Sequence, residues 1–286
     1  AASDVYKRQM LLIEVANKRL NLPERSVSCN PLSTSKSKNT MNRILILYIF
    51  LLLCGTVSAQ RTVEWNDLQT LTDDARRTVY YKKDSKRPLQ GKYCIIRGLD
   101  EEHVKLSDGM INGDYRRYRD GVLRESGIYV KGKRNGTFTE YYQDGVTPRK
   151  ETPMLQGKID GTVKTYFRNG KIEIEKEYRQ SVENGRERRF ANKTGEQIFE
   201  SHYIDGEKDG EEWEIFEDGR AIRSKTTRHY RNGKLNGSYR VESTWEGKPY
   251  ITIEGQYTDG EKSGRWIQHN HKENTQTCTW HGEGGD

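Results

Sequence analysis

The feature that most constrains this chain is a glycine-containing unit that recurs every 22 to 27 residues over most of its length. A period of this size indicates an array of repeats, in which each unit buries its apolar side chains against its neighbours. The marker glycine of each unit, which precedes a short alternating run, stands at Gly91, Gly113, Gly136, Gly161, Gly185, Gly210, Gly237 and Gly264.

The unit at residues 203–230 shows what each repeat encodes. It holds two alternating runs joined by Asp218-Gly219, and Asp205-Gly206 makes the turn before them. Asp-Gly between alternating runs is a strong signal for a β-hairpin whose turn residues have positive φ. One hairpin alone is only marginally stable in water. The sequence therefore predicts an all-β fold, an elongated and twisted open sheet built from an array of antiparallel β-hairpins.

Aromatic residues hold repeated places in these units, and all five tryptophans and 15 of the 17 tyrosines follow Gln60. They can form a packing ladder between adjacent hairpins, or they can anchor a peptide or a glycan on an extended face. The candidate binding residues are Tyr129, Tyr178, Tyr203, Trp213, Tyr230, Tyr239, Tyr257 and Trp266.

The first 59 residues differ in character and are excluded from the predicted fold. Residues 1–40 are polar and without period, and their opening AASDVYKRQ has the form of translated adapter sequence, so a non-native or disordered leader is expected. Residues 41–59 begin at Met41 with a short basic stretch, continue with an apolar run at 44–53, and end in a small-residue site at 57–59. This is the pattern of a cleaved secretory signal peptide.

Three other interpretations of residues 41–59 stay open: a buried helix, an uncleaved anchor, and a lipoprotein signal with Cys54 as the lipidated residue. The apolar run is shorter than the about 20 residues that a spanning helix needs. Leu53 is bulky where a lipoprotein signal has a small residue. We therefore expect export to the periplasm, the cell envelope or the extracellular space, with no transmembrane segment in the mature chain.

The charge of the chain does not indicate nucleic-acid binding. The formal net charge is +7, but eight basic and three acidic residues precede Gln60, which leaves a net +2 on the remainder. Charges in the repeats alternate in sign, as in KIEIEKE at 171–177, which is typical of a solvated strand face with cross-strand pairs. Nucleic acid is therefore not an expected partner.

Two cysteines, Cys94 and Cys278, lie beyond residue 59. Export would permit a disulfide between them. Two strands per hairpin, each about 4.8 Å from the next, place these residues roughly 60–70 Å apart in an open array. A disulfide needs Cα atoms within about 7 Å of each other, so both thiols are expected to be unpaired unless the array closes or dimerises.

Three regions are expected after the signal peptide. Residues 60–78 form an N-terminal segment, with one or two helical turns at 67–77. Residues 79–268 form the repeats and begin with a hairpin at 79–93. Residues 269–286 form a C-terminal cap or tail.

The pattern of the units, Y-x-x-G-K-x-x-G-x-(aromatic)-x-x-(Y/F)-x-x-G, resembles the MORN repeat in the variant form of bacterial YwqK-type proteins. The matching residues are Tyr203, Gly206, Gly210, Trp213 and Gly219, and likewise Tyr230, Gly233, Gly237 and Tyr239. The resemblance covers about residues 79–267 and implies an elongated run of hairpins with a tyrosine-bearing face. It also implies the label of antitoxin in a toxin–antitoxin system. Val163 stands where an aromatic is usual, and Val182 where glycine is usual, so a wider turn is expected at Val182.

No Ser, His, Asp or Cys stands in the sequence context of a catalytic nucleophile, so no catalytic residue and no cofactor are expected. One C-terminal group carries nitrogen and sulfur donors that suit Zn²⁺: His269, His271, Cys278 and His281. Their spacing matches no standard zinc motif, so a polar capping hairpin is expected here, and a metal site is the alternative.

The repeats and the signal peptide together predict an exported, non-enzymatic protein-interaction scaffold. An array of hairpins offers an extended surface and no deep pocket, which suits a protein partner better than a small substrate. Two other functions stay open: an antitoxin-like inhibitor of a cognate toxin, and a glycan-binding protein of the cell envelope.

Overall fold

The computed structural model describes residues 60–219 and 221–282, so the predictions for residues 1–40 and 41–59 lie outside the described residues. Apart from one 3-10 turn, η1 (Trp65–Asp67), the described residues form strands and the turns between them. None of their helical residues makes a helix long and apolar enough to cross a membrane. The strands are β1 (Arg61–Glu64), β2 (Leu68–Thr72), β3 (Thr78–Lys82), β4 (Gly91–Arg97), β5 (Asp100–Ser107), β6 (Met110–Arg119), β7 (Val122–Val130), β8 (Lys133–Tyr141), β9 (Pro148–Leu155), β10 (Lys158–Ile159), β11 (Gly161–Tyr166), β12 (Ile172–Arg179), β13 (Val182–Phe190), β14 (Gln197–Ile204), β15 (Glu207–Lys208), β16 (Gly210–Glu217), β17 (Ile222–Arg231), β18 (Lys234–Trp245), β19 (Lys248–Thr258), β20 (Glu261–Asn270) and β21 (Thr275–His281).

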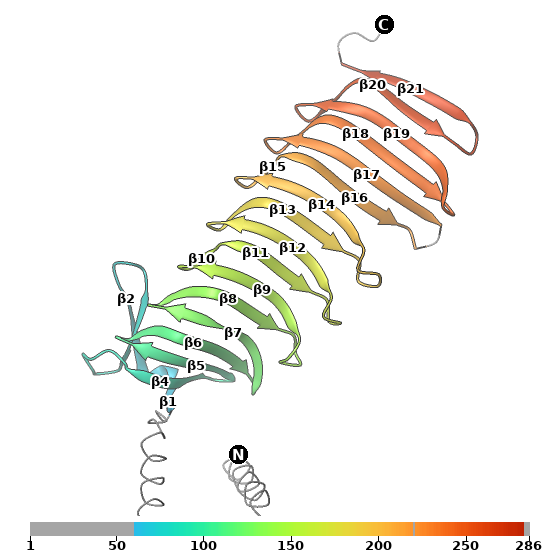
Figure 1. The fold of residues 1–286 in the computed structure, drawn as a ribbon. Helices are drawn as coiled ribbons and strands as arrows, with labels where there is room; N and C mark the ends of the chain where they lie inside the picture. The colour runs from blue at the N-terminus through green and yellow to red at the C-terminus, as the bar shows by residue number, and fades with distance from the viewer. Residues whose placement is uncertain (1–59, 220, 283–286) are drawn as a thin grey trace, which may run out of the picture. The chain divides into compact units, whose positions relative to one another are not determined.

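Nineteen strands of the described residues form one open, mostly antiparallel sheet, which confirms the predicted fold class (Figure 1). From β4 onward the strands pair in the order in which they occur along the chain. The short strands β10 and β15 extend the pairing of β9 and β14. β1 pairs with β4 in parallel, so it occupies the side of β4 that the first repeat leaves free.

Two-residue turns with positive φ at both positions join the hairpins at one edge of the sheet. The predicted Asp218-Gly219 turn is instead part of a longer loop, since β16 ends at Glu217, β17 begins at Ile222, and the N–H of Asp218 donates to the carbonyl of Ile222 at 3.2 Å. Asp205-Gly206 does form the two-residue turn, with φ values of 50° and 91°. The prediction of a wider turn at Val182 is wrong. Gln180 and Ser181 form a two-residue turn with φ values of 52° and 71°, and Val182 pairs directly with Arg179. Ser181 tolerates this conformation because its N–H donates to the carbonyl of Ile159 at 2.7 Å, and its Oγ accepts from the N–H of Ile159 at 2.9 Å.

Recurrent β-bulges bend the strands. The register shifts at the same place in successive units, between Lys176 and Tyr178 and again between Arg228 and Tyr230. A bulge increases the bend and the twist of its strand. Because the shifts repeat from unit to unit, neighbouring strands curve together, as Figure 1 shows.

The N-terminal segment differs from the prediction in two ways. The prediction of helical turns at 67–77 is wrong, because β2 and β3 form a separate two-stranded hairpin there. Of the hairpin expected at 79–93 only an isolated antiparallel bridge between Tyr81 and Pro88 is present. The strands themselves pair otherwise, β3 with β2, and β4 with β1 and β5. Asp73 closes the β2–β3 turn, since its Oδ1 accepts from the N–H groups of Ala75 at 3.0 Å and Arg77 at 2.8 Å.

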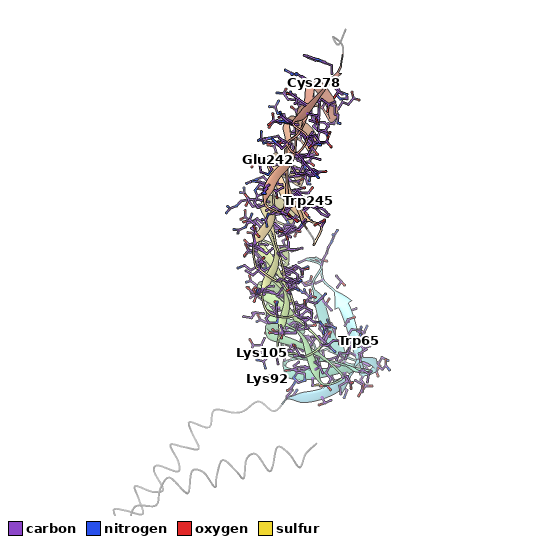
Figure 2. All side chains as sticks on the ribbon, turned by 90° about the vertical axis from the view of Figure 1, so that its right-hand side faces the viewer. Trp65, Lys92, Lys105, Glu242, Trp245 and Cys278 are labelled. Atoms are coloured by element: carbon purple, nitrogen blue, oxygen red, sulfur yellow. The ribbon has the colours of Figure 1, made fainter. Side chains whose placement is uncertain are left out.

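The two faces of the main sheet differ, because successive side chains of a strand point to opposite sides. We call the face that carries the unit-closing tyrosines the tyrosine face, and the other the opposite face. Figure 2 views the sheet from its edge, with Trp65 and Trp245 on the tyrosine face and Lys92, Lys105 and Glu242 on the opposite face.

The β2–β3 hairpin covers the N-terminal end of the tyrosine face and completes the main hydrophobic core. The N–H of Tyr80 donates to the carbonyl of Gly109 at 2.8 Å, and a Cβ added at Gly109 would come within 2.5 Å of Val79, so hairpin and sheet are closely packed. Leu68 and Tyr80 of the hairpin are buried with residues of β4, β5, β6 and β8. The core comprises Leu68, Tyr80, Tyr93, Ile95, Val104, Leu106, Ile111, Tyr115 and Phe138.

Because this hairpin buries Tyr80, the stability of the N-terminal end should decrease at alkaline pH. Burial, followed by the charge of Glu102, raises the pKa of Tyr80 to about 12, against about 10 in an unfolded chain. The folded state therefore holds this proton more tightly than the unfolded state. The corresponding stabilisation is complete below about pH 10 and is lost as the pH rises to about 12, a total of about 3 kcal/mol.

Tyr80→Phe tests this expectation, because it keeps the ring and removes the ionisable group. The free energy of unfolding, measured by urea titration at about pH 9 and about pH 11.5, should fall by about 2 kcal/mol more in the wild type than in the variant. Equal losses in the two proteins would show that Tyr80 has the same pKa in the folded and unfolded states and would contradict the expectation.

Candidate functional site

One row of side chains crosses the tyrosine face from strand to strand, and we call it the central row. Its members are cross-strand neighbours, and members of one hairpin stand 11 residues apart, as Lys176–Glu187 and Arg228–Tyr239 do. Most of the row is buried, although the sheet has one layer over most of its length. The central row comprises Tyr93, Val104, Tyr115, Gly127, Phe138, Thr152, Val163, Lys176, Glu187, Ser201, Glu212, Arg228, Tyr239, Gly255 and Trp266.

Near its N-terminal end the row carries a cluster of three aromatic rings packed over a glycine. The ring centroids of Tyr115, Tyr129 and Phe138 lie 5.3 to 6.3 Å apart. The ring of Phe138 lies on Gly127, where an added Cβ would come within 2.6 Å of it. Glycine at this position therefore makes room for the ring.

The same arrangement recurs at the C-terminal end. The ring centroids of Tyr239, Tyr257 and Trp266 lie 5.2 to 5.6 Å apart. Trp266 lies on Gly255, where an added Cβ would come within 2.2 Å of the indole. Two glycine–aromatic pairs of the central row thus frame the middle of the sheet.

In the middle of the row, buried glutamates replace the rings. Glu187, with a side chain that is 4% exposed, contacts Lys176 at 3.0 Å and Arg189 at 2.6 Å, and it accepts a hydrogen bond from the hydroxyl of Tyr203 at 3.2 Å. Burial alone would raise the pKa of Glu187, but the hydrogen bonds from Lys176 and Arg189 hold it below its usual value. Burial and the charge of Glu187 raise the pKa of Tyr203 to about 12, so this hydroxyl remains a donor.

The next unit repeats this polar cluster. Glu212 contacts Lys208 and the Nε of Arg228, the latter at 3.1 Å, and it accepts from the hydroxyl of Tyr230 at 3.4 Å. Lys208 also lies over the ring of Tyr230, 5.0 Å from its centroid. These charges belong to the packed interior of the tyrosine face and not to a solvated surface.

Seven of the eight aromatic residues predicted as a binding face lie on the tyrosine face. Tyr129, Tyr178, Tyr203, Tyr230 and Tyr257 each lie opposite a marker glycine, and Tyr239 and Trp266 belong to the central row. Tyr129, Tyr203, Tyr230 and Tyr257 contact members of that row, which is the first of the two roles considered for them. Trp213 lies on the opposite face with Lys225, 5.0 Å from its ring, because it follows Gly210 by three residues and not by two. The eight residues therefore do not share one surface.

The tyrosine face of β17 to β21 carries a continuous set of uncharged side chains, which we call the uncharged patch. Alternation along the strands produces it. In 240–243 the uncharged Val241 and Ser243 face the tyrosine side, and in 251–254 Ile251 and Ile253 do. The apolar members are half-buried, and Trp245 is 48% exposed. The patch comprises Ile222, Ser224, Thr226, Val241, Ser243, Trp245, Ile251, Ile253, Gln268, Asn270, Thr275 and Thr277.

The structure brings together two of the four predicted C-terminal metal ligands. The rings of His269 and His271 have centroids 4.2 Å apart. Cys278 pairs with Ile267, and Arg265 donates to its Sγ at 3.2 Å. His281 lies on the tyrosine face against Trp266, with ring centroids 6.1 Å apart. Among the described residues these four do not form a group of three donors at metal-binding distance, and β21 completes a hairpin with β20.

One serine and one histidine on the opposite face form a contact of the kind used in catalysis. Oγ of Ser238 lies 2.9 Å from Nδ1 of His229, and Nε2 of His229 lies 3.6 Å from Glu211. The same Nδ1 also lies 3.2 Å from the carbonyl oxygen of Ser238, and His202 repeats this contact with the carbonyl of Glu211 at 3.2 Å. A ring nitrogen that donates to a carbonyl cannot accept the serine proton. We therefore assign both histidines to cross-strand bonding.

Cys94 and Cys278 are free thiols in the structure. They lie on β4 and β21, near the two ends of the strand order, as the linear array predicts.

Together these features define the class of the protein as an open β-hairpin repeat array, with a packed central row and an uncharged patch on one face. No protein-family model matches the sequence, and no curated protein matches it either.

Proposed function

We propose that this protein is an exported, non-enzymatic scaffold of the MORN-like type, which binds another protein through the uncharged patch. The observation behind the proposal is that charged and uncharged side chains alternate along β17 to β19, so that the uncharged ones share one face. On the opposite face the same strands carry Arg223, Lys225, Arg240, Glu242 and Glu254. A sheet with one polar and one apolar face usually packs its apolar face against something, and exposed apolar surface marks interaction sites.

The occupant that fits is a protein segment with apolar side chains, because the chain supplies such a segment at its own N-terminal end. There the β2–β3 hairpin covers the tyrosine face, and its Leu68 and Tyr80 are each 8% exposed. No described residue performs this role over the uncharged patch. A partner segment would bury Val241, Ile251 and Ile253, with Trp245 as an aromatic anchor at the margin.

Two neighbouring substitutions on β19 test the proposal. Ile253→Glu places a charge in the uncharged patch, and Thr252→Glu places the same charge on the opposite face of the same strand. We expect affinity capture from the exported fraction of the source cells to recover a protein with the wild type and with Thr252→Glu. Recovery should fall at least tenfold with Ile253→Glu, since an unpaired charge would be buried in the interface.

Other outcomes distinguish the alternatives. Equal recovery with both variants would place binding elsewhere and contradict the proposal. Retention on a polysaccharide resin, lost with Ile253→Glu, would favour the glycan-binding function. A captured protein whose expression alone arrests growth would favour the antitoxin function. Circular dichroism of both variants confirms that each one is folded.

A further inference from the structure

A cysteine, a glutamate and a histidine lie together on the opposite face near the N-terminal end of the sheet. Cys94 of β4 and His103 of β5 are direct cross-strand partners, and Glu101 lies two residues before His103 on the same face. Oε2 of Glu101 lies 3.9 Å from Sγ of Cys94 and 3.4 Å from Nε2 of His103. The three donor atoms lie within 4.8 Å of one another.

These separations suit a tetrahedral metal ion. Zn²⁺ binds sulfur, nitrogen and oxygen at about 2.0 to 2.3 Å, which puts two ligand atoms about 3.3 to 3.8 Å apart. Two of the three separations are already close to that range. The third needs a small rotation of the His103 side chain, which is 35% exposed and packs against the ring of Tyr118 with centroids 4.8 Å apart.

The charges around the thiol also favour a cation. The carboxylates of Glu101 and Glu64 place negative charge near the Cys94 thiol. Glu64 belongs to β1, and its parallel pairing with β4 puts it beside Ile96. Among the described residues neither glutamate forms an ion pair with Lys or Arg, and Glu101 pairs only with His103.

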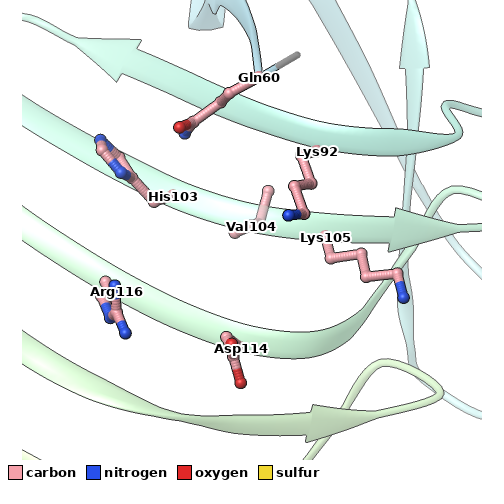
Figure 3. Close-up of a pocket in the computed structure, with 7 residues that line it drawn as sticks. All are labelled: Gln60, Lys92, His103, Val104, Lys105, Asp114 and Arg116. Atoms are coloured by element: carbon pink, nitrogen blue, oxygen red, sulfur yellow. The ribbon is translucent and has the colours of Figure 1, made fainter. Parts of the chain in front are cut away.

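His103 also lines a hollow of about 220 Å³ beside the three donor residues (Figure 3). The other lining residues are Gln60, Lys92, Val104, Lys105, Asp114 and Arg116. Arg116 is the cross-strand partner of His103 on β6, so it lies on the side of His103 away from Cys94. These basic side chains weaken the general attraction for cations, and binding therefore depends on direct bonds to the thiolate, the imidazole and the carboxylate.

We propose that Cys94, Glu101 and His103 bind a divalent transition metal such as Zn²⁺, with Glu64 of β1 as a further oxygen donor. Thiolate and imidazole ligands select Zn²⁺ over Mg²⁺ and Ca²⁺, which prefer sites made of oxygen atoms. Binding replaces the proton of the thiol by the metal and releases that proton to water. A bound ion would link β4 and β5 to the parallel strand β1.

Titration of the full, reduced chain with Co²⁺ tests the proposal, because a cobalt–thiolate bond gives a characteristic absorption band. We expect the band to saturate at one ion per chain and to disappear when Zn²⁺ is added. Cys94→Ser should abolish the band, while Cys278→Ser, Cys29→Ser and Cys54→Ser should keep it. His103→Ala should weaken Co²⁺ binding at least tenfold.

A thermal unfolding series gives a second readout that does not depend on the absorption band. Zn²⁺ should raise the Tm of the wild type and of Cys278→Ser, and it should leave that of Cys94→Ser unchanged. Absence of any thiolate band, or a band that survives in Cys94→Ser, would overturn the proposal. A band lost in Cys278→Ser instead would move the metal to the C-terminal histidines and overturn it too.

Discussion

Phe138→Ala should lower the free energy of unfolding by about 3 to 5 kcal/mol, the range for deletion of a fully buried aromatic ring. Phe138 is 2% exposed, and it packs against Tyr115, Tyr129 and Gly127 in the N-terminal aromatic cluster. Arg134 also lies over its ring, 4.5 Å from the centroid. Chemical denaturation followed by circular dichroism would measure the loss.

Phe216→Ala is the matched control, because Phe216 lies on the same face and is 63% exposed. Its effect should stay within about 0.5 kcal/mol. If the two alanine variants lost similar stability, the aromatic cluster would not be the stabilising unit that its packing indicates. Gly127→Ala adds a second check, since the new Cβ would displace the ring and should cost about 1 to 3 kcal/mol.

The second large effect is expected from Lys176→Met, which should cost about 3 kcal/mol. It removes one partner of the buried Glu187 carboxylate, and breaking a buried ion pair costs about 3 to 5 kcal/mol. The lower end applies because Arg189 still contacts Glu187. In the wild type the contribution of Glu187 is present at neutral pH and is lost as the pH falls through its lowered folded-state pKa.

The double variant Lys176→Met, Glu187→Leu separates the ion pair from simple packing. Replacing both partners removes the unpaired charge, so at least half of the lost stability should return. Arg240→Met is the control for an exposed pair, since Arg240 is 48% exposed where it contacts Glu254, and it should cost at most about 1 kcal/mol. A double variant less stable than Lys176→Met alone would refute the assignment of Glu187 as a buried ionic centre.

The repeat architecture was predictable because its signals are local. Asp-Gly and Asn-Gly at the turns and the recurrence of the marker glycines specify a hairpin in each unit, and the structure forms these hairpins. The N-terminal segment was not predictable in the same way. The run at 78–82 can pair with the run before it or with the run after it. The turn that Asp73 closes favours pairing with the run before it.

Which face of the sheet a side chain occupies depends on its distance in residues from the marker glycine, and the aromatic pattern alone does not show this distance. Trp213 stands one residue out of phase with Tyr239 and Trp266, and Glu187 and Glu212 hold the phase that aromatics hold elsewhere. Charge alternation made these glutamates look solvated, whereas their distance of two residues from a marker glycine puts them in the central row. The alternation in β18 and β19 was a readable signal for the uncharged patch.

The metal-binding group could not be derived from sequence alone. Glu101-x-His103 places two ligands on one side of a strand, but which residue of β4 faces them depends on register. The hairpin between β4 and β5 is irregular in sequence, so its register came only from the structure. Cys94 and His103 are nine residues apart and carry no recognisable zinc spacing.

The constant distance of 11 residues within the central row makes each hairpin an exchangeable module. In Gly127–Phe138 and Gly255–Trp266 a glycine pairs with a large aromatic ring, and in Lys176–Glu187 a basic residue pairs with an acidic one. Such positions should vary jointly among homologous chains, and a repeat should pass from its ionic to its aromatic form by two coordinated replacements. The array can in this way lengthen by duplication while each new copy acquires its own chemistry.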